Sequence, residues 1–364
     1  MPLELLGKSA DELRALATEW GEPPFRGAQI YHALYAERRF DFATMSNLPA
    51  ALRERLASEA AITLPQVKRR YQASDGTVRY VLSLPEGATN SPATLAKSPT
   101  NIETVFMPEE ARQTICISTQ AGCAVDCRFC LTATLGLIRN LSPGEIVGQV
   151  LVAIEDNREK LGPRTNGVLM GQGEPLLNYD AVMTAMRILL DKEGVGLSPK
   201  HVTLSTSGIV PGIERLAAEQ VRPKLAVSLN ASSDEQRNQI MPINRKYPLA
   251  ALMEACRRYP LRSWEHITFE YVMLGGLNDT PEDARRVVKL VANLRCKVNL
   301  IPWNPGELPY RAPEVECVET FRNILTDRSV RAFVRFSRGQ EIMAACGQLA
   351  LLESQQNPPV QISV

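Results

Sequence analysis

The sequence predicts an α/β protein built on a parallel sheet of six strand–helix units, either open or curled into a partial (β/α)6 barrel, with a small helical domain before it and a C-terminal extension after it. From residue 102 onward, short β-branched runs alternate with stretches that carry helix-start signals, which is the pattern of strand–helix units in a parallel sheet. The chain of 364 residues is also long enough for one barrel-sized domain with an appended region.

Residues 1–70 are predicted to form the helical domain. Ser9 and Glu12 have the spacing of a capping box, and apolar residues follow at helical intervals. A second helix is expected to start near Phe25 and a third to span about 48–60. Basic pairs at the ends of these elements leave two interpretations open: a solvated helical cap, or a domain that contacts RNA.

Residues 71–101 are predicted to form a hairpin and a flexible loop. The hairpin turns at Asp75-Gly76, a dipeptide that suits a tight turn between strands. The loop follows over 85–101, where Pro, Ser, Thr and Ala dominate the composition.

The barrel itself is assigned to residues 102–310. Helix starts are expected at Ser142 and Thr280, where a proline and an acidic residue follow in the first turn. The extension, residues 311–364, begins with helix and strand material that includes a strand over 330–336. The runs expected to form barrel strands are 113–119, 166–172, 201–207, 224–230, 267–273 and 297–303.

These strands end in polar or glycine-rich sequence, such as GQGEP, STSG, SLNA and PWNPG. In a β/α barrel the carboxyl ends of the strands form the active-site face. One such ending is an ordinary turn, but several in register indicate a single site.

Composition limits the classes of partner and compartment. The net charge of +1 means that any contact with nucleic acid must use local patches. No stretch approaches the ~18 apolar residues that a membrane helix needs, and the N-terminus lacks a signal-peptide pattern. We therefore expect a cytoplasmic protein without membrane contact, whose cysteines are thiols, metal ligands or catalysts rather than structural disulfides.

Three of the eight cysteines are crowded into the segment GCAVDCRFC. Cys123, Cys127 and Cys130 have the spacing Cys-x3-Cys-x2-Cys and directly follow the first predicted barrel strand. A structural zinc site is the alternative, but it needs four ligands, and the chain has neither a second cysteine pair nor clustered histidines. A [4Fe-4S] cluster held by three cysteines leaves one iron open for a non-protein ligand.

This cysteine spacing, at the head of a series of β/α units, resembles the radical S-adenosylmethionine (radical SAM) superfamily. Further segments occur in order and make the chain similar to the RNA adenine-C2 methyltransferases of that class, the RlmN type: GQGEPLLN, VTLSTSGIVP, MPINRKYPL, KVNLIPWNP and AACGQLA. The similarity runs from about Leu5 to Ala350. It implies a radical SAM partial barrel in which Cys123, Cys127 and Cys130 bind the cluster and SAM chelates the open iron.

The resemblance also implies a reaction that uses two SAM molecules per turnover. One SAM methylates Cys346, and the second yields a 5′-deoxyadenosyl radical that takes a hydrogen from the S-methyl group. The resulting carbon adds to adenine C2, Glu103 accepts the C2 proton, and thiol attack by Cys116 releases the product and leaves a Cys116–Cys346 disulfide. Taken alone, each of these cysteines would be interpreted as a packing residue.

By the same resemblance, the polar strand ends bind SAM. A glycine turn allows close backbone approach and a carboxylate suits an ammonium group. The SAM contacts that the resemblance implies are Gly173, Glu174, Ser205, Ser228, Leu229, Asn230 and Asn304.

The expected partners are rRNA, tRNA or both, and an electron donor of the flavodoxin or ferredoxin kind; the protein is expected to be a monomer. Residues 321–340 contain five arginines and one acidic residue, which suits phosphate contact near Cys346, although a solvated basic edge is the alternative.

Two other functions stay open. A C8-methylating relative of the antibiotic-resistance type would use the same thiols and cluster. A zinc-stabilised RNA-binding protein without enzymatic activity would use the three cysteines structurally.

Overall fold

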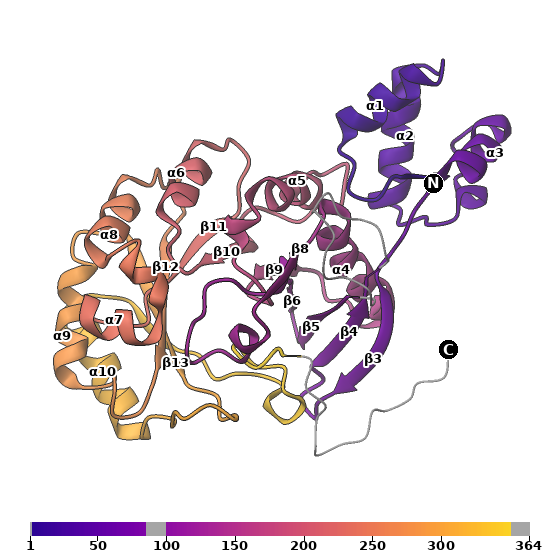
Figure 1. Ribbon diagram of the computed structural model, residues 1–364. Helices are drawn as coiled ribbons and strands as arrows, with labels where there is room; N and C mark the ends of the chain where they lie inside the picture. The colour runs from indigo at the N-terminus through magenta and orange to yellow at the C-terminus, as the bar shows by residue number, and fades with distance from the viewer. Residues whose placement is uncertain (1, 85–99, 351–364) are drawn as a thin grey trace.

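The computed structural model describes residues 2–84 and 100–350 (Figure 1). The loop predicted over 85–101 therefore lies outside the described residues except for its last two positions, and the end of the extension beyond Ala350 also lies outside them. No helix within the described ranges is long and apolar enough to cross a bilayer.

Three helices form the N-terminal region, as the sequence predicts, and Figure 1 shows them at one corner of the molecule. Parallel pairing of two short strands brings the beginning and the end of this region together. The elements are β1 (Leu3–Glu4), α1 (Ala10–Glu19), α2 (Pro24–Tyr35), α3 (Ala50–Glu59) and β2 (Ala60–Ala61).

Local sequence signals account for the start of α1 and for its contact with the barrel. The Ser9 side chain accepts from the backbone of Glu12, and the Glu12 side chain accepts from Ser9, so the predicted capping box is confirmed. Just before this helix, a Cβ on Gly7 would lie 2.4 Å from the backbone nitrogen of Gly144. Only glycine allows the N-terminal region to approach the following barrel helix so closely.

A ten-stranded mixed sheet forms the body of the protein. Its first four strands in the chain are antiparallel neighbours, and the others are parallel to β6. The predicted hairpin at Gly76 is thus continuous with the barrel sheet. In sheet order the strands are β14 (Ala332–Val334), β13 (Cys296–Pro302), β12 (Ile267–Met273), β11 (Lys224–Ser228), β10 (Val202–Thr206), β9 (Thr165–Leu169), β6 (Arg112–Cys116), β5 (Asn101–Glu109), β4 (Val78–Ser83) and β3 (Gln66–Gln72).

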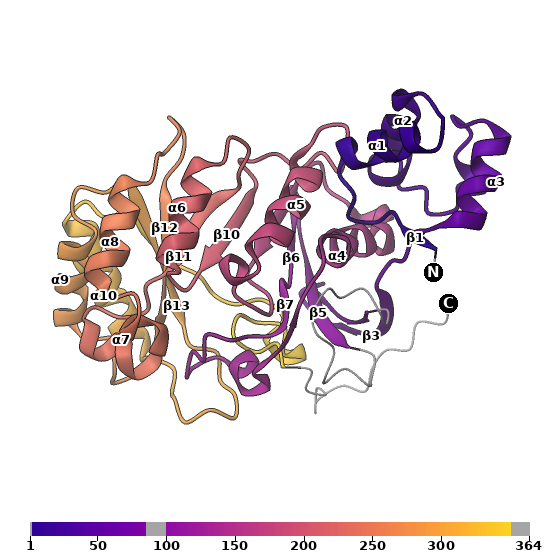
Figure 2. The same cartoon turned by 45° about the horizontal axis from the view of Figure 1, so that its top comes forward.

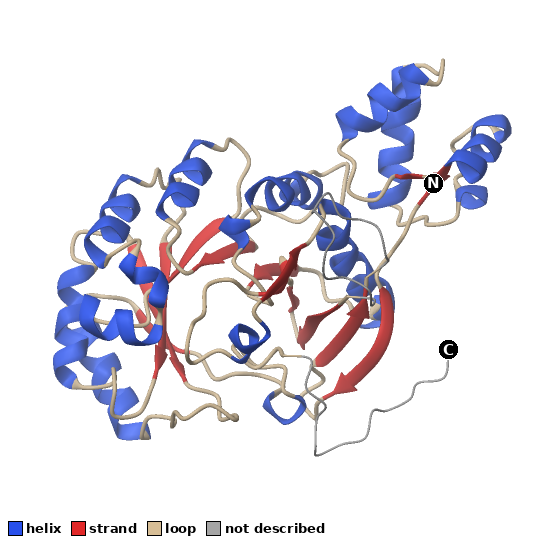
Figure 3. Ribbon diagram, in the orientation of Figure 1, coloured by secondary structure: helices blue, strands red, loops and turns tan. Residues whose placement is uncertain are grey.

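Helices cover the outer face of the parallel part of the sheet, as Figures 2 and 3 show. The capping boxes predicted at Ser142 and Thr280 are both present at helix starts. The helices are α4 (Pro143–Asp156), α5 (Tyr179–Leu190), α6 (Val210–Ala218), α7 (Asp234–Ile240), α8 (Leu249–Arg258), α9 (Pro281–Leu290) and α10 (Val315–Asp327). The observed strands and helices confirm the predicted α/β architecture of strand–helix units.

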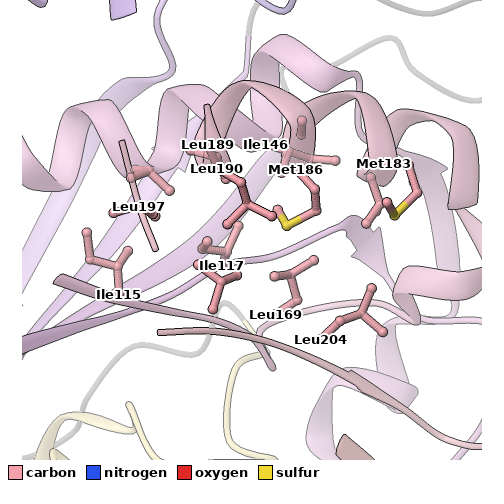
Figure 4. Close-up of a cluster of buried hydrophobic side chains, with 14 of the residues drawn as sticks. Ile115, Ile117, Ile146, Leu169, Met183, Met186, Leu189, Leu190, Leu197 and Leu204 are labelled. Atoms are coloured by element: carbon pink, nitrogen blue, oxygen red, sulfur yellow. The ribbon is translucent and has the colours of Figure 1, made fainter. Parts of the chain in front are cut away.

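The main core lies between the sheet and these helices (Figure 4). Burying each aliphatic side chain there contributes roughly 1.5–3 kcal/mol. Side chains that Figure 4 draws in this layer are Ile115, Ile117, Ile146, Leu169, Met183, Met186, Leu189, Leu190, Leu197 and Leu204.

Successive side chains along each strand alternate between the helix-covered face of the sheet and the face that lines the inside of the barrel. On β6, Ile115 packs in the helix-side core, whereas Thr114 and Cys116 line a cavity inside the barrel. On β9 and just after it, Leu169 belongs to the core and Val168 and Met170 line the cavity. Because successive side chains point to opposite faces of a sheet, the same strands supply both the core and the site.

Candidate active site

The loop that carries the three clustered cysteines is closed by a two-stranded ribbon, β7 (Gln120–Gly122) and β8 (Leu137–Asn140). Gly122 has φ +72°, and a Cβ there would lie 1.8 Å from the carbonyl oxygen of Gly136. The Cys123 N–H donates to that same oxygen at 2.9 Å. A glycine at position 122 therefore allows the ribbon to close at the start of the loop.

Cys123, Cys127 and Cys130 line one cavity of about 170 Å³ at the carboxyl ends of the strands. Burial raises the pKa of the Cys123 thiol to about 12 and also raises the pKa values of the Cys127 and Cys130 thiols. Deprotonating these thiols in place requires nearby positive charge, which iron supplies to its cysteine ligands. The three side chains therefore fit a cluster chemically.

The geometry of the three thiols differs from that of a single-ion site. Among residues 2–84 and 100–350, no group of three or more Cys, His, Asp or Glu side chains is arranged to hold one metal ion. In an iron–sulfur cluster each cysteine binds a different iron, so its ligands surround a cavity instead of converging on a point. The cysteine loop has that form.

Six of the seven predicted SAM contacts line the same cavity as the cysteines: Gly173, Glu174, Ser205, Ser228, Asn230 and Asn304. Leu229 does not line it, because its side chain is fully buried in the core. The structure thus brings residues from five different chain segments to one wall.

The Glu174 carboxylate connects two of these strand-end loops. One oxygen accepts from the Leu176 N–H at 3.1 Å, and the other accepts from the N–H and hydroxyl of Ser207 at 2.7 and 2.8 Å. Burial raises the pKa of Glu174, and the Ser207 hydrogen bonds oppose that shift. Next to it, Gly173 has φ +98° and lies so close to Gln120 that a Cβ would clash.

Asn230 occupies a backbone conformation that suits asparagine. Its φ is +54°, in the left-handed region that few other non-glycine residues adopt. Its side-chain oxygen accepts from the Val272 N–H at 2.8 Å, which fixes the loop after β11 to the end of β12. The side chain therefore shapes the cavity wall through a contact within the protein.

The fully buried Arg237 supports the same loops from behind. Its guanidinium donates to the carbonyl oxygens of Ser207, Ser228 and Leu229 and to the side-chain oxygen of Asn244, at distances of 2.6–3.1 Å. Burial lowers its pKa to about 10, and the neighbouring Cys127 and Asp234 oppose that effect.

The segment around Cys346 is docked directly on the cysteine loop. The Leu131 N–H donates to the Gly347 carbonyl at 2.7 Å, and the Thr132 hydroxyl donates to the Leu349 carbonyl at 2.6 Å. On the other side, the Asn304 amide donates to the Cys346 carbonyl at 3.0 Å. These contacts place the Cys346 thiol at the wall of the cysteine cavity.

A second, larger cavity of about 610 Å³ meets the first at Cys346. Cys346, Met170 and Ile301 line both cavities, and Cys116 lines the second. Burial raises the pKa of Cys116 to about 12, with a further contribution from Cys346. The structure therefore brings the two predicted catalytic cysteines together, as free thiols.

The second cavity is strongly basic. Burial and neighbouring cations lower the pKa values of Lys224, Lys297 and His201, so these groups repel one another in the absence of an anion. The basic residues that line it are Arg112, Arg164, His201, Lys224, Lys297, Arg335 and Arg338, against the single acidic residue Glu109.

Glu103 lies behind the cavity wall, since it is not among the residues that line either cavity. Its carboxylate is fully buried and accepts from the guanidinium of Arg79 at 2.6 Å; Arg79 is also fully buried and lies over the Tyr71 ring. A more distant contact, 3.4 Å, joins Glu103 to the Gln172 amide. Glu103 and Cys116 lie on adjacent strands, but this state separates the carboxylate from the cavity.

Comparison with known proteins agrees with this geometry. A family model described as the radical SAM superfamily matches residues 117–291, and one described as the ribosomal RNA large subunit methyltransferase N-terminal domain matches residues 3–62. A probable dual-specificity RNA methyltransferase RlmN from Koribacter versatilis is 47% identical over 351 residues, covering 92% of this chain and 97% of the relative. The RlmN protein of Anaeromyxobacter dehalogenans is also 47% identical, covering 93% of this chain and 90% of the relative.

The chain belongs to the RlmN family of radical SAM RNA methyltransferases. A crystal structure of a radical SAM methyltransferase from Sphaerobacter thermophilus has a TM-score of 0.87 and 41% identity, and the match covers 96% of this chain and 99% of that one. Membership of the RlmN family confirms the recognised resemblance and the predicted enzyme class. A [4Fe-4S] cluster and SAM come with this family, whereas the roles of individual residues stay predictions.

The sequence reasoning did not identify the basic wall of this RlmN-family chain. Of the arginines singled out near the C-terminus, Arg335 and Arg338 line the cavity, and the other basic residues come from separate strands. A signal was nevertheless present: a basic residue stands at or beside the start of most parallel strands. These residues are Arg112, Arg164, His201, Lys224, Lys297 and Arg331.

Proposed function

We propose that this protein methylates C2 of a specific adenine in RNA, in 23S rRNA and also in tRNA, by way of a methyl group carried on Cys346. One observation carries the proposal: Cys346 lines both the cavity that holds the three cysteines and the basic cavity. A single sulfur can therefore face SAM on one side and a nucleobase on the other.

In this proposal Cys123, Cys127 and Cys130 hold the cluster, and the strand-end residues that line the same cavity hold SAM. When bound, the cluster and two SAM molecules supply an electron, a methyl group and a hydrogen-abstracting 5′-deoxyadenosyl group. The chain contributes a cavity that the hydrophobic core separates from the outer helices. It also holds the Cys346 thiol at the wall of this cavity through main-chain hydrogen bonds on both sides of the residue. Fixing the thiol in this way keeps the reacting groups close and aligned.

Cys346 forms the covalent link to adenine, and two further residues resolve it. Glu103 accepts the C2 proton, which requires Arg79 or the cavity wall to shift so that the carboxylate reaches the base. Cys116 then attacks the Cys346 sulfur: the sulfur–methylene bond breaks, the two sulfurs join in a disulfide, and the released carbon takes up a proton to become the methyl group on C2. The electron left over from radical addition would return to the cluster, and an external reductant would reopen the disulfide for the next turnover. The placement of both thiols on one cavity supports this division of roles.

The basic cavity is the proposed RNA-binding side. Lys224, Lys297, Arg335 and Arg338 would neutralise phosphates next to the target nucleotide, whose base must leave its stack to reach Cys346. An electron donor of the flavodoxin or ferredoxin kind would reduce the cluster. We further propose that the protein acts as a monomer in the cytoplasm.

The decisive experiment is anaerobic incubation of the reconstituted protein with methyl-labelled SAM, a reductant and purified rRNA or tRNA, followed by mass spectrometry of the nucleosides. The proposal predicts 2-methyladenosine. Formation of 8-methyladenosine would favour the C8-methylating alternative, and a protein that contains zinc without iron and ignores SAM would favour the non-enzymatic one.

A further inference from the structure

A buried carboxylate on β12 has no role in the site described so far. Glu270 pairs in register with Ser228 on β11 and with Asn299 on β13, so the three side chains form a polar row across adjacent strands. Only 5% of Glu270 is exposed, yet it lines the cavity that also contains Cys346. An acidic group in this position needs an explanation, because burying a charge is costly unless the charge is paired.

The two oxygens of Glu270 differ in their contacts. Oε1 accepts from the Asn299 amide at 3.0 Å and lies 3.8 Å from the Arg335 guanidinium. Oε2 is inaccessible to solvent and has no hydrogen-bond partner among the described residues. Buried polar atoms are nearly always hydrogen-bonded, so an unpartnered oxygen at a cavity wall indicates a missing donor that a ligand supplies.

Glu270 lies at the boundary between the two cavities. Its partners Asn299 and Arg335 line the basic cavity, whereas Glu270 itself lines the cysteine cavity. Its charge also acts on the thiol at this boundary: although Cys346 is an exposed residue, enclosure of its thiol by the cavity raises its pKa, Arg335 lowers it and Glu270 raises it again. Glu270 and Cys346 line the same cavity, so a base that reaches Cys346 from the basic cavity can meet Glu270 where the two cavities join.

We propose that Oε2 of Glu270 accepts a hydrogen bond from the 6-amino group of the target adenine, while Asn299 fixes the orientation of the carboxylate. The inference rests on the function proposed above and assigns a specificity residue to it. The 6-amino group is the only exocyclic donor of adenine. Guanine and hypoxanthine carry a carbonyl oxygen at that position, which a carboxylate repels.

The same contact also orients the ring. In adenine only N1 lies between C6 and C2, so holding the amino edge at Glu270 turns the C2 edge toward a neighbouring group. The neighbour at this boundary is Cys346. Glu270 therefore selects the base and aligns the carbon that reacts.

The test uses two short RNA hairpins that differ only at the target, which is adenosine in one and purine riboside, without the amino group, in the other. Single-turnover methyl transfer is measured for wild type, Glu270→Ala, Glu270→Gln and the control Thr268→Val. Thr268 lies two residues before Glu270 on the same strand and is also buried. The intrinsic reactivity of the two bases cancels when their rate ratio is compared between variants.

Wild type and Thr268→Val are expected to methylate the adenosine hairpin about tenfold to a hundredfold faster than the purine-riboside hairpin, which is the discrimination that a specific base contact provides. Glu270→Ala should lose this preference because only its rate on adenine falls. Glu270→Gln conserves the side-chain volume. The amide oxygen of the introduced glutamine should keep accepting from Asn299, which leaves the amide NH2 facing the adenine amino group. Two donors cannot pair, so the preference for adenine should be lost in this variant as well. SAM affinity and methylation of Cys346, measured without RNA, should stay at the wild-type level.

Retention of the adenine preference in Glu270→Ala and Glu270→Gln would overturn this inference alone. Weaker SAM binding with the preference intact would also overturn it and would place Glu270 on SAM instead. A wild-type protein that methylates neither RNA would overturn the proposed function, and this inference with it.

Discussion

Replacing Arg237 by methionine should destabilise the protein and weaken SAM binding together. The guanidinium is fully buried and donates to the carbonyls of Ser207, Ser228 and Leu229 and to Asn244. Hydrogen bonds to a charged group contribute about 1.5–3 kcal/mol each, but removing the buried charge also removes its desolvation cost. We therefore expect a loss of about 4 kcal/mol in the free energy of unfolding.

Lysine at position 237 should cost less than methionine, because it keeps the charge but has at most three donors and no planar fork. The loops that lose their support contain Ser228 and Asn230, so the dissociation constant of SAM should rise by about tenfold, equivalent to ~1.4 kcal/mol.

The assay is urea unfolding followed by circular dichroism, with SAM affinity measured by calorimetry. The matched control is Arg257→Met on α8, where the arginine is about half exposed and its carboxylate partner Glu254 is 3.7 Å away. This control should change stability by less than about 0.5 kcal/mol. If Arg237→Met matched the control in both measurements, the role given to the buried guanidinium would be wrong.

Five further outcomes follow from the site. Replacing any of the three clustered cysteines by alanine should abolish iron content and 5′-deoxyadenosine formation, measured by iron assay and chromatography. Glu103→Gln should accumulate the RNA–protein adduct on denaturing gels, because an amide cannot accept the C2 proton, while normal product formation would remove Glu103 from the mechanism. Cys346→Ala should give no adduct, whereas Cys116→Ala should stall with RNA attached through Cys346, as peptide mapping would reveal. Because the pKa of Cys116 is about 12, its thiolate fraction and the rate of adduct resolution should rise about tenfold per unit between pH 7 and 9; a flat profile would contradict thiolate attack. Lys297→Met should weaken RNA binding and reduce the slope of log affinity against log salt by about one.

The fold was largely predictable because its local signals agree with its tertiary structure. The capping boxes at Ser9, Ser142 and Thr280 all start helices. The main error was length at strand ends. The run 113–119 was predicted as a strand, but β6 ends at Cys116; the chain bends at Thr119, although the N–H groups of Ile117 and Thr119 still donate to β9 and to the segment after it. Serine and threonine suit both strands and turns, so local propensity could not place this boundary.

The site was predictable where residues are adjacent in sequence and unpredictable where strands bring them together. The spacing of the three cysteines identified their loop directly. By contrast, the Arg79–Glu103 pair joins two strands that flank a long loop, and its burial follows from packing that no local pattern encodes. The row of Ser228, Glu270 and Asn299 depends on the register of three strands in the same way.

The shared position of Cys346 also affects how reactants and products move. Cys346 lines both cavities, so under the proposed function SAM and RNA would reach the same sulfur from different sides and neither would have to leave before the other enters. In this proposal the spent thioether product of SAM could dissociate while the RNA stays bound, and methylated RNA could depart without disturbing a SAM bound in the cysteine cavity. Steady-state kinetics should therefore show no compulsory order of addition for the two substrates, even though one atom serves both.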